Sequence, residues 1–100
     1  MSKTDIPVIS VVTPTFNRAN ELYFLVQSIQ NQTLDHSLFE MIIADDGSTD
    51  HTEILIQSLK DKIDFTLKIF TQKNQGPGAA RNYGINKSIG ELILFIDSDC

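Results

Sequence analysis

Two hydrophobic patterns alternate along this chain of 100 residues. Short runs of mostly apolar, often β-branched residues occur four times, at Val8–Val12, Phe39–Ala44, Phe65–Phe70 and Leu92–Ile96. Near-continuous apolar runs of this length are typical of strands that are buried on both faces. The four runs therefore predict four buried strands.

The segments between the runs carry the signals of helices. From about Asn20 to Gln32, apolar residues fall on one helical face: Leu22, Leu25, Val26 and Ile29. Asp50 and Glu53 have the spacing of a capping box, which predicts the start of a second helix. A third helix is expected to begin near Pro77–Gly78 and to end at Gly90, because proline suits the first turn and glycine suits the left-handed end of a helix.

The resulting order is β-α-β-α-β-α-β. Strands separated by helices favour a parallel sheet with right-handed crossovers, so we predict a doubly wound α/β half-domain. In such sheets, ligands bind outside the carboxyl ends of the strands, at a switch point in strand order.

Composition narrows the classes of partner. Eight basic and 13 acidic residues give a formal net charge of −5, which argues against nonspecific binding to nucleic acid or to an anionic membrane. The single cysteine, Cys100, excludes an internal disulfide, and the longest apolar run, LILFI, is far shorter than the roughly 20 residues of a membrane span. We expect a cytoplasmic protein, and peripheral contact with the inner membrane face stays open.

Every segment with polar or charged side chains suited to ligand binding follows a predicted strand. These segments are Thr13–Arg18, Asp45–Asp50, Thr71–Arg81 and Asp97–Asp99. Because the carboxyl ends of parallel strands meet at one edge, we expect the four segments to form one site.

Two of these segments offer groups for a nucleotide. Asp46, at the end of a strand, can accept hydrogen bonds from a nucleobase N–H or from ribose hydroxyls, and Asp50 is expected to cap the next helix. Arg81 is placed to pair with Asp46 or to clamp a diphosphate. Asn17 or Asn20 is an alternative helix cap, with Pro14 fixing the turn.

The last segment has the chemistry of a metal site. Asp97 and Asp99 follow a buried strand, and two carboxylates this close repel each other unless a cation lies beside them. One or two carboxylates, together with water and substrate phosphates, are the ligands that Mg²⁺ and Mn²⁺ prefer. The pair therefore predicts a metal ion that in turn holds a diphosphate.

Four motifs together resemble a known family. VVTPTFNR, IIADDGSTD, NQGPGAARNYGI and ELILFIDSD, in this order, are similar to the N-terminal nucleotide-binding half of family 2 glycosyltransferases, which have the GT-A fold. The resemblance covers essentially the whole chain. It implies a Rossmann-like, mostly parallel sheet of about four strands in the order 3-2-1-4, with helices on both faces.

The resemblance also implies roles for individual residues. Pro14 and Thr15 would line the pocket for base and ribose, Asp46 would contact the uracil, and Arg81 would lie near the nucleotide. Asp97 would lie by the ribose or the metal, and Asp99 would coordinate Mg²⁺ or Mn²⁺. We assign Asn17 and Asp45 to the same nucleotide site.

The activity implied is inverting transfer from a nucleotide-sugar donor, most often a UDP-sugar, to a hydroxyl of a growing polysaccharide or a glycolipid. The general base is expected beyond Cys100, so we expect residues 1–100 to be the donor- and metal-binding half of a longer enzyme, ending directly after its DxD motif. A non-catalytic nucleotide-binding or assembly module is the alternative. Bare strand edges predict self-association of the chain.

Overall fold

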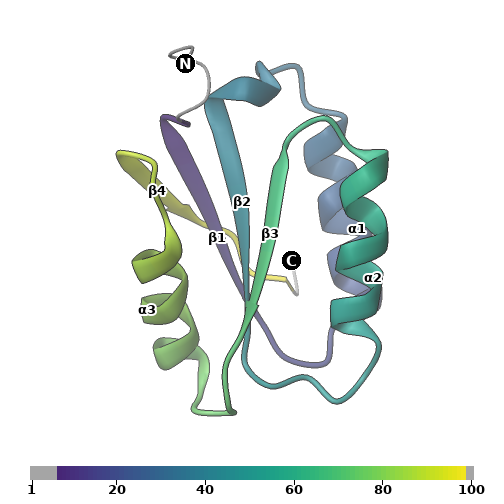
Figure 1. Ribbon diagram of the computed structural model, residues 1–100, viewed down its shortest axis with the longest axis vertical. Helices are drawn as coiled ribbons and strands as arrows, with labels where there is room; N and C mark the ends of the chain where they lie inside the picture. Colours follow the sequence, from purple (N-terminus) through teal and green to yellow (C-terminus); the bar gives the residue numbers. More distant parts are fainter. Residues whose placement is uncertain (1–6, 99–100) are drawn as a thin grey trace.

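The computed structural model describes residues 7–98 (Figure 1). Its elements follow the predicted β-α-β-α-β-α-β order: β1 (Ile9–Thr15), α1 (Ala19–Gln30), β2 (Phe39–Asp45), α2 (Thr52–Leu59), β3 (Thr66–Thr71), α3 (Pro77–Lys87) and β4 (Leu92–Phe95). Two single 3-10 turns, η2 (His36–Leu38) and η3 (Lys60–Lys62), precede β2 and β3.

The four strands form one parallel sheet in the order β3-β2-β1-β4, which confirms the expected 3-2-1-4 topology. Helices α1 and α2 cover one face and α3 covers the other, as Figure 1 shows on either side of the sheet. The chain therefore places its loops after β1, β2, β3 and β4 at one edge, because every strand runs in the same direction.

The main core lies between the sheet and the pair α1 and α2. Strand β2 is buried along its whole length because it has a strand on each side and helices on both faces. The residues of this core come from both layers of that side, the sheet and the two helices: Val11, Leu22, Val26, Ile29, Phe39, Met41, Ile43, Ile56, Leu59, Phe65 and Leu67.

On the opposite face, α3 lies very close to the sheet. A Cβ atom at Gly84 would lie 2.5 Å from Val12 Cγ1 and 3.4 Å from the Cβ of Ala44. Glycine at this position lets the helix approach β1 and β2, and this approach fixes where the first turn of α3 meets the carboxyl edge of the sheet.

At the amino end of the sheet, beyond the C-terminal end of α3, a buried carboxylate connects side chains of three strands. Glu40 is fully buried and accepts hydrogen bonds from Ser10 Oγ at 2.6 Å, from the Ile89 N–H at 2.8 Å and from Lys68 Nζ at 3.0 Å. Burial by itself would raise the pKa of Glu40, but these hydrogen bonds and the Lys68 charge lower it. Nothing in the apolar pattern of the sequence indicated this network.

The prediction that all four strands are buried on both faces is wrong for the two edge strands, because β3 is only partly buried and β4 is mostly exposed. Leu92, Leu94 and Phe95 are 58%, 52% and 48% exposed. β4 is an edge strand that pairs only with β1, and among the described residues no helix covers its outer part. An apolar run cannot by itself distinguish a covered strand from an uncovered one.

Two predicted helix boundaries are also wrong. The Glu53 side chain does not return to the Asp50 N–H, which donates instead to Asn17, so the capping box is not formed. Asp50 accepts a hydrogen bond from the N–H of Thr52, the first residue of α2, at 3.0 Å, but the residue at the cap position is His51 and not Asp50. Helix α3 ends at Lys87 rather than at Gly90, and Gly90 is needed because a Cβ there would lie 2.7 Å from Ser10 Oγ.

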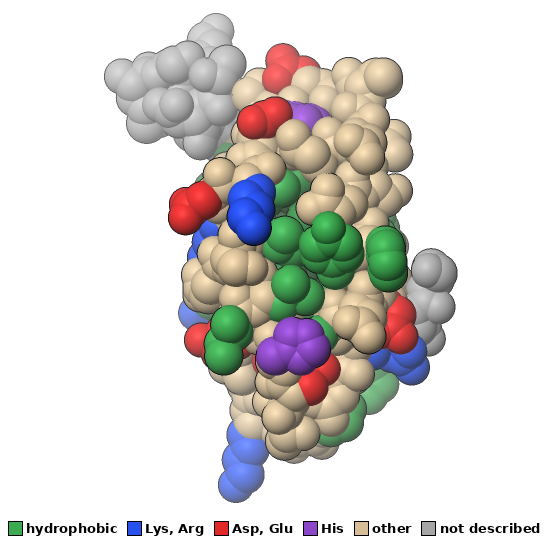
Figure 2. All heavy atoms as spheres, turned by 90° about the vertical axis from the view of Figure 1, so that its right-hand side faces the viewer, with side chains coloured by type: hydrophobic (Ala, Val, Ile, Leu, Met, Phe, Trp, Pro, Cys, Tyr) green, Lys and Arg blue, Asp and Glu red, His purple; other side chains and the backbone are tan. Residues whose placement is uncertain are grey.

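Figure 2 views the molecule from the side of α1 and α2 and shows hydrophobic side chains gathered near the middle of that face. The most exposed apolar side chains of these two helices are Phe24 and Ile54, at 69% and 75%. Within residues 7–98, no helix has the length and apolar character that crossing a bilayer requires.

Candidate functional site: a pocket at the carboxyl edge of the sheet

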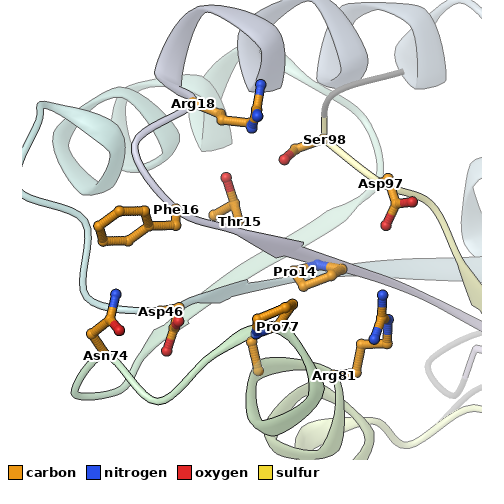
Figure 3. A pocket seen from close by; sticks show the side chains of 11 residues that line it. Pro14, Thr15, Phe16, Arg18, Asp46, Asn74, Pro77, Arg81, Asp97 and Ser98 are labelled. Atoms are coloured by element: carbon orange, nitrogen blue, oxygen red, sulfur yellow. The ribbon is translucent and has the colours of Figure 1, made fainter.

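The four loops that follow the strands surround a cavity of about 490 Å³ (Figure 3). This confirms that the four polar segments after the strands meet at the carboxyl edge of the sheet. The lining comes from all four loops and from the first turns of α3: Pro14, Thr15, Phe16, Arg18, Asp46, Asn74, Pro77, Ala80, Arg81, Asp97 and Ser98.

The end of β1 provides one wall. β4 pairs with β1 only as far as Val12, so Pro14, which has no N–H to donate, lies where β1 has a single neighbour. Thr15 is 5% exposed, and its Oγ1 has no hydrogen-bond partner within the described chain. A buried hydroxyl without a partner is costly, and in Figure 3 this hydroxyl points toward Arg18 and Ser98.

The end of β2 provides an ionised carboxylate. Asp46 Oδ1 accepts hydrogen bonds from Gln72 Nε2 at 2.9 Å and from the Gln75 N–H at 2.8 Å, and its Oδ2 accepts from the Gly76 N–H at 2.9 Å. Burial acts to raise the pKa of Asp46, but these three hydrogen bonds outweigh it and lower the pKa. Asp46 therefore organises the β3–α3 loop and presents a negative charge to the pocket.

Two residues that we assigned to the nucleotide site lie outside the pocket lining. Asp45 is buried and accepts hydrogen bonds from the N–H and the hydroxyl of Ser48, within its own loop. The Asn17 side chain accepts from the backbone of the β2–α2 loop, at Thr49 and Asp50. Neither Asn17 nor Asn20 caps α1 through its side chain, because the residue at the cap position is Arg18.

Arginine side chains reach the cavity from two elements. Arg81 lies in α3 and lines the pocket on the side of Asp97, whereas Arg18 lines it from the start of α1 and forms an ion pair with Glu21 at 3.8 Å (Figure 3). Asp46 takes its hydrogen bonds from the β3–α3 loop, so of the two roles expected for Arg81 the structure does not show the pairing with Asp46.

The end of β4 brings oxygen ligands to the cavity. Asp97 and the buried Ser98 line it, whereas Asp99, the second expected metal ligand, lies outside the described residues. Within residues 7–98 no group of three or more His, Cys, Asp or Glu side chains could hold a metal ion. A single carboxylate at the cavity is still compatible with Mg²⁺ or Mn²⁺, because these cations keep several water or substrate ligands in addition to one or two carboxylates.

Sequence reasoning missed part of the lining. Phe16 is 45% exposed at the pocket, and an aromatic residue inside a polar loop was the available signal. Asn74, to which the sequence analysis gave no individual role, also lines the cavity. Pro77 was expected only as a helix start, which it is, and its ring also lines the cavity.

A parallel α/β sheet with a pocket at its carboxyl edge places the chain among the α/β proteins that bind small ligands at this edge. The model of the family "Glycosyl transferase family 2" matches residues 10–100. The chain therefore belongs to this family of glycosyltransferases, and its fold is GT-A, as the resemblance implied.

Three similar proteins illustrate the match. The chain is 41% identical over 95 residues to the GalNAc(5)-diNAcBac-PP-undecaprenol beta-1,3-glucosyltransferase of Campylobacter jejuni, covering 93% of this chain and 30% of that protein. Staphylococcus aureus TarS 1-349 in complex with UDP-GlcNAc has a TM-score of 0.83 at 34% identity, with 91% of this chain and 26% of that chain covered. Mycobacterium tuberculosis glucosyl-3-phosphoglycerate synthase, in complex with Mn²⁺, UDP and glucosyl-3-phosphoglycerate, has a TM-score of 0.73 at 26% identity, with 92% and 33% covered.

The chain spans only part of its relatives. It covers between 13% and 37% of the length of eight curated glycosyltransferases that it resembles. The described pocket therefore corresponds to one part of those longer proteins.

Proposed function

We propose that this chain is the donor-binding half of an inverting, metal-dependent glycosyltransferase that uses a UDP-sugar. The observation that carries the proposal is the meeting, in one cavity, of three groups from the end of β1, the end of β2 and helix α3. These are a buried hydroxyl without a partner, an ionised carboxylate and a guanidinium, supplied by Thr15, Asp46 and Arg81. A volume of about 490 Å³ is within the range of small-molecule sites.

In this proposal the base lies between the ends of β1 and β2. The Asp46 carboxylate accepts the uracil N–H, because an ionised carboxylate is an acceptor only. The exposed ring of Phe16 offers a face for stacking, and the Thr15 hydroxyl takes a hydrogen bond from the base or ribose. Complexes of two similar structures with UDP-GlcNAc and with UDP support uridine as the nucleoside.

The diphosphate lies toward Arg81 and Asp97 in this arrangement. The Arg81 guanidinium can bind phosphate oxygens in a bidentate manner. Asp97, together with Asp99 outside the described residues, would hold Mg²⁺ or Mn²⁺, which would neutralise the charge that develops on the leaving diphosphate. The complex of one similar protein with Mn²⁺ supports this choice of cation.

The transfer itself belongs to the longer protein. An acceptor hydroxyl loses its proton to a general base beyond Cys100, its oxygen bonds to the anomeric carbon, and the bond between that carbon and the diphosphate oxygen breaks with inversion. We propose a saccharide or glycolipid acceptor in polysaccharide biosynthesis, and a cytoplasmic setting at the inner membrane face. One relative, whose name includes PP-undecaprenol, supports a lipid-linked acceptor.

Calorimetric titration of the chain with UDP, with and without Mn²⁺, tests the donor site. We expect binding that requires Mn²⁺, is lost in Asp99→Ala and weakens about tenfold in Arg81→Gln, which keeps a polar side chain but removes the charged guanidinium. Asn86→Ala, an exposed change near the far end of α3, is the control and should bind as the wild type does.

Metal-independent binding, or equal affinity for Arg81→Gln and Asn86→Ala, would contradict the proposed diphosphate site. UDP binding without donor turnover by the longer protein would instead favour the non-catalytic module. Circular dichroism of each variant must show the wild-type spectrum before its affinity is interpreted.

A further inference from the structure

Asn17, in the β1–α1 loop, contacts the β2–α2 loop, and residues of both loops line the pocket. Its φ of 54° makes it the one non-glycine residue with a positive φ among residues 7–98. Asparagine tolerates this left-handed conformation better than most residues do. The turn at Asn17 is bounded by two pocket residues, Phe16 before it and Arg18 after it.

The backbone and side chain of Asn17 both bind the β2–α2 loop. Its Oδ1 accepts hydrogen bonds from the N–H of Thr49 at 2.8 Å and of Asp50 at 3.2 Å, and its own N–H donates to Ser48 Oγ at 2.8 Å. In return, Asp50 Oδ2 accepts from the N–H of Ala19, the first residue of α1, at 3.4 Å. Each loop thus satisfies backbone groups of the other.

These contacts connect two walls of the cavity. Phe16 and Arg18 line it from the β1–α1 loop, and Figure 3 shows both side chains around the space above Asp46. Ser48, which accepts from Asn17, also donates to the carboxylate of Asp45, the residue next to Asp46. The Asp46 N–H in turn donates to the Thr15 carbonyl at 2.9 Å.

We infer that Asn17 is a positioning residue of the nucleotide pocket: it fixes the wall carrying Phe16 and Arg18 relative to the wall carrying Asp46 before the ligand arrives. Rigidity built into the free protein lowers the ordering that binding must otherwise supply, so affinity depends on a side chain that does not touch the ligand. The identity of that ligand rests on the proposed function.

Three variants separate the side-chain contacts from the backbone conformation. Asn17→Gly keeps the freedom to adopt a positive φ but removes the acceptor. Asn17→Asp keeps an acceptor and tolerates the same conformation, so it should rescue the contact. Asn20→Gly makes the same chemical change three residues later, at an exposed position of α1, and is the matched control.

The test combines two measurements on folded protein. By calorimetry with Mn²⁺, the Kd for UDP should rise about tenfold in Asn17→Gly, stay within about threefold in Asn17→Asp and be unchanged in Asn20→Gly. The reason is that only Asn17→Gly loses the acceptor for the N–H groups of Thr49 and Asp50. By amide hydrogen exchange without ligand, the protection of Thr49 and Asp50 should fall about tenfold in Asn17→Gly alone.

Equal UDP affinities for Asn17→Gly and Asn20→Gly would overturn the inference, because a purely structural role lowers stability without changing the affinity of the folded protein. If the wild type itself does not bind UDP, the proposed function fails, and the exchange measurement decides about Asn17 separately. Unchanged protection of Thr49, Asp50 and Asp46 in Asn17→Gly would then overturn it, whereas a loss confined to that variant would support it.

Discussion

Oδ2 of Asp46 accepts a hydrogen bond from the backbone N–H of Gly76 at 2.9 Å, although the two residues are 30 positions apart in the chain. The contact ties the end of β2 to the turn that begins α3. Gly76 adopts a φ of 102°, a conformation that glycine adopts without strain. The same carboxylate therefore shapes one wall of the pocket and contributes charge to it.

We predict that Asp46→Asn lowers the free energy of unfolding at pH 7 by about 1–3 kcal/mol, because an amide NH₂ would face a backbone donor. The pKa of Asp46 is lowered in the folded state, so its stabilisation is present above the unfolded value of 3.8 and is lost as the pH falls through the folded pKa. The difference between variant and wild type should shrink below about pH 4.

Urea unfolding at pH 7 and at pH 3 measures this difference. Asp61→Asn, a change in the 3-10 turn before β3, is the control and should behave as the wild type at both pH values. A loss of stability in Asp46→Asn that is equally large at pH 3 would show that charge is not the cause.

A second prediction compares two threonines of β1. Thr13 and Thr15 each bury a hydroxyl that has no partner within the described chain, but only Thr15 lines the pocket. Replacing either by valine removes the unsatisfied group, so neither variant should be less stable than the wild type. UDP binding should weaken about tenfold in Thr15→Val alone. Equal affinities of the two variants, measured by calorimetry, would remove Thr15 from the donor site.

A third prediction concerns the buried pair of Glu40 and Lys68. The Lys68 side chain is 34% exposed, so solvent screening weakens its ion pair with Glu40. Lys68→Met should therefore lower the free energy of unfolding by about 1–2 kcal/mol at pH 7. The pKa of Glu40 is lowered when the protein is folded, so the stabilisation exists above 4.5 and disappears as the pH falls through the folded pKa.

Chemical denaturation across pH 3 to 7 should therefore show that Lys68→Met is less stable than the wild type only at the higher pH values. Lys62→Met, in the exposed turn before β3, serves as the control for removing a lysine. If both variants lose the same amount of unfolding free energy, the ion pair of Glu40 and Lys68 makes no specific contribution to stability.

A fourth prediction uses two glycines of α3. Alanine usually stabilises a helix relative to glycine by about 1 kcal/mol, and Gly78→Ala should be neutral or stabilising, because nothing lies within 4 Å of the new Cβ. Gly84→Ala should instead destabilise by about 1–3 kcal/mol, since its Cβ would lie 2.5 Å from Val12 Cγ1. Thermal unfolding of both variants checks the sign, and a stabilised Gly84→Ala would show that α3 can move away from the sheet freely.

A fifth prediction concerns self-association with a second copy of the chain. β4 has one paired edge, and Leu92 and Leu94 are 58% and 52% exposed, which is the character of an edge that pairs with another strand. Sedimentation velocity should show a fraction of dimer that increases with protein concentration, and Leu94→Lys should lower that fraction. A single monomeric species at high concentration for the wild type would contradict this prediction.

Local pattern was sufficient for the order of elements and for the edge that carries the site. The 3.6-residue spacing around Leu22 and Val26 and the apolar run before Asp45 are properties of neighbouring residues, so they can be read without the fold. The order 3-2-1-4 and the GT-A fold came from the resemblance of four motifs to a family, and the family match confirmed it.

The partners of the polar groups were decided by the tertiary structure. Asp46 binds Gly76 and Asn17 binds Thr49 across about 30 residues, and no local signal specifies which of several loop donors a carboxylate or an amide will meet. The exposure of β4 has the same origin. An apolar run favours burial, but only the packing of whole elements determines which of its side chains are covered.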